Sequence, residues 1–349
     1  MKKYVWILVV IIIAVIISLT YPFNETKTIQ IGVSEALTGN YADIGNDITR
    51  GIRKAFSEID SQKMFGDKVE LVISDNAADP KLAVGDYQLY KSQNIKIVMS
   101  AFSGVINALN PLSKQDGVIL MHMAATDQFA KENEYAFKLY SDTTKEASLI
   151  SKYIWLNKLE GQLGIVYVEN PTTVLLINHF KNELAGFKKY SFNPKDTDFR
   201  TIITKMKADN IKNVILLGYS TQDLAFIKQS AELKFQPKYV FTTSDGSVKD
   251  IIDNVESFIS SSTKYLTTAY GVNDLNYLFG YDIAKTLIKG MESCHNLGQK
   301  ADDPECLKIE LKKVSFEGKS GQINITEDRV AEVFPTLMTI ENKKLVPFE

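Results

Sequence analysis

The chain has 349 residues, of which 45% are hydrophobic and 23% are charged. This composition is typical of a globular protein and excludes an intrinsically disordered one. The formal net charge is −2, so the chain lacks the basic excess of a nucleic-acid-binding protein. Two cysteines and three histidines are too few for a structural zinc cluster, and we expect neither a metal nor a cofactor.

The first 26 residues predict the compartment. Lys2 and Lys3 precede an uncharged segment, from Tyr4 to Asn24, that is long enough to cross a bilayer as a helix. We interpret residues 1–26 as an uncleaved membrane anchor; the alternative is a cleaved signal peptide, although no Ala-x-Ala cleavage site follows the apolar run. No cysteine follows it either, which excludes a bacterial lipoprotein anchor. Both interpretations place the rest of the chain outside the cytoplasm.

From Ile29 to about Lys114 and again after Tyr140, short apolar runs alternate with segments of helical spacing. In the first half, strands are predicted at Ile29–Val33, Val69–Ile73, Ile95–Met99 and Val118–Met121, with helices between them. In the second half, strands are predicted at Leu163–Val168, Tyr190–Phe192, Val214–Leu217 and Tyr239–Thr242, separated by helices Val174–Leu184, Phe199–Ala208 and Asp223–Leu233. Repeated β-α units form parallel, doubly wound sheets, so the pattern predicts two α/β lobes.

The C-terminal part does not predict a third domain. It contains a strand at Tyr265–Ala269, helices at Leu278–Met291 and Cys306–Val314, and late strands at Gln322–Ile325 and Glu332–Thr339. These elements would overfill either lobe alone. We therefore expect them to be shared, with the chain crossing between the lobes more than once.

Catalytic motifs are missing. The glycines of the first loop, Gly39 and Gly45, do not have the spacing of a dinucleotide-binding fingerprint. No G-x-S-x-G nucleophile elbow is present, and the histidines do not have metalloprotease spacing. An enzyme is therefore not expected.

Ligands of doubly wound sheets bind outside the carboxyl ends of the strands. Four loops of this chain follow such strand ends. They contain Phe102-Ser103-Gly104, Ala124-Ala125-Thr126, Gly218-Tyr219-Ser220 and Thr243-Ser244-Asp245. Hydroxyl and backbone N–H groups in the first two loops suit a carboxylate, and Asp245 suits an ammonium group. The alternative is that Ser103 and Thr126 only cap helices and Asp245 only forms a turn.

Cys294 and Cys306 are close in sequence and fall in the extracytoplasmic part of the chain. We expect a local disulfide there, because oxidising compartments favour such bonds. The alternative is two independent buried thiols.

Several segments between Lys27 and Glu349, occurring in the same order along the chain, resemble the Leu/Ile/Val-binding family of ABC transporter substrate-binding proteins. The segments are Ile31–Val33, Leu37–Gly45, Gly51-Ile52, Ser103–Pro111, Gly117–Ile119, Ala124–Thr126, Asp198-Phe199, Gly280–Asp282 and Phe316–Ile323. The resemblance implies the type I periplasmic binding protein fold: two Rossmann-like lobes joined by a three-stranded hinge, with the ligand cleft between them.

The resemblance also implies site residues. The α-carboxylate of an amino acid would meet Ser103, Gly104 and Thr126 with backbone groups of Ala124 and Ala125. The α-ammonium would meet Asp245, and Tyr219 would cover the ligand. Tyr41 and Phe102 are further candidates for the lining, together with Ile44 and Tyr270.

The expected domains are an anchor or signal segment at residues 1–26, a first lobe at 27–142 plus 271–326, and a second lobe at 143–270 plus 327–349. The expected function is capture of an amino acid, neutral or branched-chain, and delivery to the permease subunits of an ABC importer by a monomeric soluble part. The alternative is a membrane-tethered sensor of amino acids or amides. Asn170-Pro171-Thr172 and the short side chain of Asp245 depart from the family pattern, which leaves the ligand open.

Overall fold

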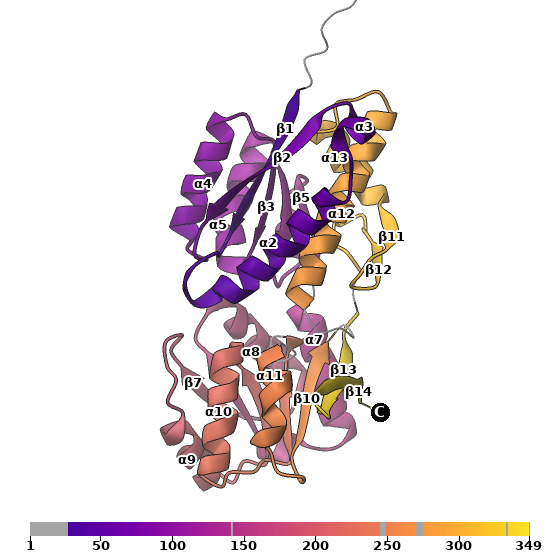
Figure 1. Ribbon diagram of the computed structural model, residues 1–349. Helices are drawn as coiled ribbons and strands as arrows, with labels where there is room; N and C mark the ends of the chain where they lie inside the picture. The colour runs from indigo at the N-terminus through magenta and orange to yellow at the C-terminus, as the bar shows by residue number, and fades with distance from the viewer. Residues whose placement is uncertain (1–26, 141, 245–248, 270–274, 333, 349) are drawn as a thin grey trace, which may run out of the picture.

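The computed structural model describes residues 27–140, 142–244, 249–269, 275–332 and 334–348. Two α/β lobes lie one above the other, each built around its own sheet (Figure 1). Between them the chain passes from β5 to α7, from β10 to α12 and from β12 to β13. The predicted two-lobed α/β architecture is confirmed. The anchor prediction falls on residues 1–26, outside the described residues; within them, no helix is both long and apolar enough to span a membrane.

The first lobe contains a five-stranded parallel sheet with the order β2-β1-β3-β4-β5. Its strands are β1 (Thr28–Glu35), β2 (Lys68–Asp75), β3 (Ile97–Ala101), β4 (Ile119–Met123) and β5 (Ala136–Lys138). Its helices are α2 (Ala42–Ser57), α3 (Ser61–Phe65), α4 (Pro80–Ser92), α5 (Ser103–Asp116), α6 (Gln128–Glu132), α12 (Leu275–Asn296) and α13 (Pro304–Glu310). Separate apolar cores cover the two faces of the sheet.

The second lobe contains a seven-stranded sheet with the order β14-β13-β10-β9-β8-β6-β7. Its strands are β6 (Leu163–Val168), β7 (Lys188–Phe192), β8 (Asn213–Leu217), β9 (Tyr239–Thr242), β10 (Lys264–Ala269), β13 (Thr336–Glu341) and β14 (Lys344–Pro347). Its helices are α7 (Thr143–Leu156), α8 (Pro171–Glu183), α9 (Arg200–Ala208), α10 (Ser220–Glu232) and α11 (Lys249–Asn254). The last two strands run antiparallel, so this sheet is mixed rather than purely parallel.

Most predicted elements are present with shifted ends, and the tail shows the largest shifts. The late strand expected at Glu332–Thr339 is β13, which begins four residues later, at Thr336. The helix expected at Cys306–Val314 is α13 followed by a 3₁₀ turn at Leu311–Lys313. A hairpin of β11 (Ser315–Glu317) and β12 (Gln322–Asn324) precedes the last crossing between the lobes.

Two glycines hold α2 and α12 close together in the first lobe. A Cβ atom at Gly51 would lie 2.1 Å from the carbonyl oxygen of Tyr277, and one at Gly280 would lie 2.3 Å from that of Ile48. Any larger residue would push the helices apart, because protein interiors are close-packed. The contact fixes α12, whose first residues lie at the boundary between the lobes (Figure 1).

Candidate functional site

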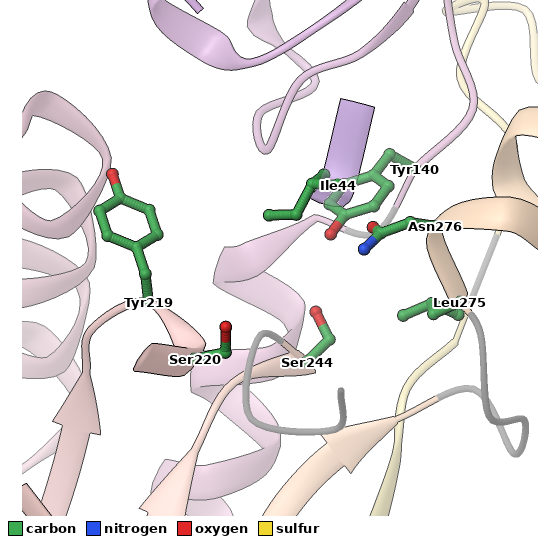
Figure 2. A pocket seen from close by; sticks show the side chains of 7 residues that line it. All are labelled: Ile44, Tyr140, Tyr219, Ser220, Ser244, Leu275 and Asn276. Carbon is green, nitrogen blue, oxygen red and sulfur yellow. The ribbon is translucent and has the colours of Figure 1, made fainter. Parts of the chain in front are cut away.

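A pocket lies between the lobes and is lined by residues of both. The first lobe contributes Ile44 of α2 and Leu275 and Asn276 of α12, and Tyr140 comes from the segment that leads to the second lobe. The second lobe contributes Tyr219, Ser220 and Ser244, which follow the carboxyl ends of β8 and β9. Figure 2 shows the hydroxyl groups of Ser220 and Ser244 pointing toward the side of Ile44, Tyr140 and Asn276. The pocket is open to solvent, and the non-atom space measured there, open solvent included, is about 340 Å³.

Aromatic rings connect the lobes beside this pocket. The ring of Tyr41 lies 5.4 Å from that of Phe102 in its own lobe and 5.0 Å, edge to face, from that of Tyr219 in the other. The Asn170 amide donates a hydrogen bond to the Tyr219 hydroxyl at 2.9 Å. The predicted site residues Tyr41, Phe102 and Tyr219 therefore lie together. Tyr219 is held by the ring of Tyr41 and by the amide of Asn170.

Asn170 belongs to the Asn-Pro-Thr segment that departs from the family pattern. Its side chain accepts a hydrogen bond from the N–H of Thr173 at 2.9 Å and so caps α8. The same side chain therefore starts a helix and fixes the hydroxyl of Tyr219, a link that the sequence pattern did not show.

The alternative interpretation of Ser103 as a helix cap does not hold. Phe102 occupies the cap position of α5 with a positive φ of 68°, and Ser103 is the first helical residue. The Ser103 hydroxyl instead accepts a hydrogen bond from the N–H of Ala125 at 3.1 Å. This bond joins the two loops predicted to bind a carboxylate, and the exposed backbone of Gly104 lies next to it.

The loop of Ala124, Ala125 and Thr126 is fixed by its neighbours. The N–H of Ala124 donates to Nδ1 of His122 at 3.3 Å, and the hydroxyl of Thr126 accepts from the N–H of Gln128 at 3.2 Å. Because His122 accepts through Nδ1, its ring carries the proton on Nε2. Burial, assisted by the charge of Lys138, lowers the pKa of His122 to about 3, so the ring is neutral.

Asp245 lies outside the described residues, as does Tyr270. The residue before Asp245 is held by a buried carboxylate that sequence reasoning missed. Glu146 of α7 is fully buried and accepts hydrogen bonds from the N–H of Ser244 at 2.7 Å and from the hydroxyl of Thr268 at 2.6 Å. One sequence signal was available: Glu146 stands on the apolar face of a helix, beside Ala147 and one turn before Ile150.

One Ser-His-Glu cluster lies outside the pocket, between α7 and α8. The Oγ of Ser148 is 2.8 Å from Nε2 of His179 and 2.7 Å from the carboxylate of Glu183. That carboxylate lies 3.0 Å from the same Nε2 atom. A catalytic triad needs the acid on the opposite ring nitrogen, so this cluster has no relay geometry. Among the described residues, no group of three or more His, Cys, Asp or Glu side chains is placed to hold a metal ion.

Two α/β lobes that line one pocket at the carboxyl ends of their strands are the arrangement of a bilobal ligand-binding protein. The chain belongs to the periplasmic binding protein family, whose sequence model matches residues 28–269. The proteins that it resembles are binding proteins and not enzymes, in agreement with the absence of catalytic motifs from the sequence.

Among curated proteins, the Leu/Ile/Val-binding protein homolog 2 of Brucella abortus is 26% identical over 236 residues. The match covers 65% of this chain and 63% of that protein. Among solved structures, the branched-chain amino acid transporter substrate-binding protein LivJ of Streptococcus pneumoniae, in complex with isoleucine, superposes with a TM-score of 0.78 at 20% identity, covering 91% of this chain and 98% of that one.

A solute-binding protein of an ABC transporter from R. palustris, in complex with benzoate, superposes with a TM-score of 0.77 at 16% identity. It covers 92% of this chain and 95% of its own. Identities this low establish the shared fold. The two neighbours were crystallised with ligands of different chemistry, and both of those ligands carry a carboxylate group.

Proposed function

We propose that the chain is the extracytoplasmic substrate-binding component of an ABC importer. It captures a small carboxylate ligand, an amino acid that is neutral or branched-chain, and delivers it to a membrane permease. The observation that carries the proposal is the pocket lined from both lobes. A ligand that touches both lobes at once stabilises the closed arrangement over an open one, which couples capture to closure.

Within this proposal, Ser103, Gly104, Ala124, Ala125 and Thr126 hold the ligand's carboxylate. The bond between the Ser103 hydroxyl and the Ala125 N–H supports this role, because a carboxylate could replace it by accepting from both groups. Tyr41, Phe102 and Tyr219 form the apolar cover. Asp245 pairs with the ammonium group, since a buried cation needs a partner.

The remaining assignments belong to the same proposal. Residues 1–26 are a membrane anchor, or a signal segment that is removed. The lobes comprise residues 27–142 plus 271–326 and residues 143–270 plus 327–349, and the part beyond residue 26 works as a monomer. The family resemblance of residues 28–269 supports a location outside the cytoplasm.

Calorimetry with leucine, isoleucine, valine and benzoate tests the proposal. We expect one of the amino acids to bind the wild-type chain. Asp245→Ala should weaken that binding by roughly two to three decades, because the desolvated ammonium loses its counter-ion at a cost of about 3–5 kcal/mol. Asp250→Ala is the matched control, since Asp250 is an exposed acidic residue five positions along the chain.

The outcomes separate two claims. Binding of benzoate with none of the three amino acids would keep the transporter class and remove the amino acid as ligand. An unchanged affinity of Asp245→Ala for the amino acid would remove Asp245 from the site. If none of the four compounds binds, the proposed ligand chemistry is wrong.

A further inference from the structure

Lys138 is a fully buried lysine at the end of β5, where the chain leaves the first lobe. Its ammonium group lies 2.8 Å from a carboxylate oxygen of Asp127. Its backbone is also fixed: the N–H donates to the carbonyl of Arg329, and the carbonyl accepts from the N–H of Ala331. The segment that carries Arg329 and Ala331 leads to the last crossing between the lobes. Lys138 therefore lies next to two of the three connections between the lobes, the one from β5 to α7 and the one from β12 to β13.

The partner of Lys138 adjoins the candidate carboxylate loop. Asp127 directly follows Thr126 and occupies the cap position of α6. His122, which accepts a hydrogen bond from the N–H of Ala124, lies beside Lys138 in the register of β4 and β5. The ion pair thus joins the end of the 124–127 loop to β5, on the face of the sheet where His122 is also buried.

A second carboxylate near Lys138 starts the first helix of the second lobe. Asp142 is largely buried and accepts a hydrogen bond from the N–H of Thr144 at 2.7 Å, which caps α7. Burial alone would raise the pKa of Asp142, but the hydrogen bond from Thr144 and the positive charge of Lys138 lower it overall. Both the hydrogen bond from Thr144 and the charge of Lys138 therefore favour the ionised form of Asp142.

The same loop and helix also touch directly. The carbonyl of Ala125 accepts hydrogen bonds from the N–H of Thr143 at 3.2 Å and from its hydroxyl at 3.3 Å. The candidate carboxylate loop of one lobe is thus bonded to the first turn of the other lobe's first helix. Movement of either segment must move or break these bonds.

We propose that Lys138 is a positioning residue for ligand binding, which holds the 124–127 loop and the first turn of α7 in one arrangement through Asp127 and Asp142. The assignment of the loop to a ligand carboxylate rests on the proposed function. The charged and titratable groups that face Lys138 are Asp127, Asp142, Lys145 and His122. Asp127 is in contact with the ammonium group, and Asp142 is attracted to it by charge.

Replacing the lysine has a specific electrostatic consequence. In Lys138→Met, the carboxylate of Asp127 loses the cation that it pairs with, and removing one partner of such an ion pair leaves the other charge uncompensated. Lys138→Arg keeps the charge. Lys91→Met is the matched control, because Lys91 pairs with Asp116 at 2.7 Å in the same lobe but is half exposed.

Amide hydrogen exchange of the ligand-free protein tests the proposal without any ligand. At pH 8, we expect Lys138→Met to exchange at least tenfold faster at residues 124–127 and at the first turn of α7. Lys138→Arg and Lys91→Met should keep wild-type exchange. Unchanged protection of both segments in Lys138→Met, or the same increase in Lys91→Met, would overturn the proposal.

Leucine calorimetry then links the arrangement to binding. We expect at least tenfold weaker binding of leucine by Lys138→Met at pH 8. If the wild type binds none of leucine, isoleucine and valine, the proposed ligand fails while the exchange result still decides the role of Lys138. Faster exchange with unchanged leucine affinity would reduce Lys138 to a structural residue.

A second variant keeps the test decisive if Lys138→Met does not fold. Asp127→Asn leaves Asp142 with the lysine, so the ion pair to the loop is lost while the cap of α7 is kept. Faster exchange is then expected at residues 124–127 alone. Unchanged exchange of this loop in Asp127→Asn would contradict the proposal.

Discussion

The carboxylate of Glu146 accepts hydrogen bonds from both the N–H and the hydroxyl of Ser244, at 2.7 and 2.9 Å. The two residues are 98 positions apart in sequence, and both are buried. Ser244 lines the pocket and directly precedes Asp245. The contact therefore ties one wall of the pocket to α7, which begins where the chain enters the second lobe.

Glu146→Gln tests this contact. The amide keeps the shape of the carboxylate but has one acceptor oxygen instead of two. Its N–H₂ group therefore faces a donor of Ser244 or Thr268, which loses its acceptor. We expect the free energy of unfolding to fall by about 1–3 kcal/mol, the cost of leaving a buried hydrogen-bonding group unsatisfied. Urea unfolding measures it. Glu169→Gln, on the exposed Glu169, is the control, and an equal change in both variants would contradict the prediction.

The packing of α2 on α12 gives a second prediction. Gly280→Ala would place a Cβ atom 2.3 Å from the carbonyl oxygen of Ile48. We expect it to lower the free energy of unfolding by about 1–3 kcal/mol, because the two helices must separate. Chemical denaturation of the full chain measures the loss.

Gly85→Ala is the matched control with the opposite sign. Gly85 lies inside α4, and a Cβ atom added there would have no neighbour within 4 Å outside its own stretch of helix. The same substitution should therefore stabilise the chain by about 0.5–1 kcal/mol through helix propensity. If the two alanine variants change stability in the same direction, close contact at Gly280 is not the cause.

The two-lobed fold could be predicted from the sequence, since it follows from local patterns. Of the expected ligand-binding residues that the structure describes, Tyr219 lines the pocket. Apolar runs with helical or strand spacing indicate the repeated units, and their loops contain Tyr219 and Ser244. Sequence patterns were misleading where the hydrogen-bond partner of a residue is distant in sequence. Ser103 has the chemistry of a helix cap, but its hydroxyl is taken by Ala125, 22 residues away. Periodicity gives no sign of such a partner.

Buried charges were missed for the same reason. Lys138 has no distinguishing signal in the sequence, and Glu146 is marked only by its place on the apolar face of α7; the tertiary structure surrounds both with partners. The short elements α6 and β5, five and three residues long, also escaped prediction because so few positions show no period. β5 matters most among these, since it ends at Lys138.

Glu35 at the end of β1 gives a prediction on pH dependence. The side chain is fully buried, and neither carboxylate oxygen has a hydrogen-bond partner among the described residues. Burial raises the pKa of Glu35 well above its ordinary value. Over the range between the ordinary and the raised pKa, the folded chain holds a proton that the unfolded chain releases. This group therefore makes the free energy of unfolding decline as the pH rises through that range.

Glu35→Gln removes this titration. We expect the variant to be more stable than the wild type at pH 8, with the difference shrinking as the pH approaches 4.5. Thermal unfolding of both chains between pH 4.5 and 8 measures the difference, and Glu70→Gln on the neighbouring strand serves as the exposed control. A difference that stays constant with pH would show that Glu35 does not hold a proton in the folded chain.

The bond between Cys294 and Cys306 gives the last prediction. It joins the C-terminal part of α12 to α13 across 12 positions, as predicted from the sequence. A loop of this size contributes about 3 kcal/mol by restricting the unfolded chain, so reduction should lower the melting temperature by roughly 5–10 °C. Cys294 lies about 28 Å along the helix from Leu275 in the pocket, estimated from the rise per residue. The order of ligand affinities should therefore be unchanged.

Calorimetric melting of oxidised and of reduced, alkylated protein makes the comparison, and Cys294→Ala/Cys306→Ala should not respond to reductant. Quantitative alkylation of both thiols in the unreduced native protein would contradict the bond itself.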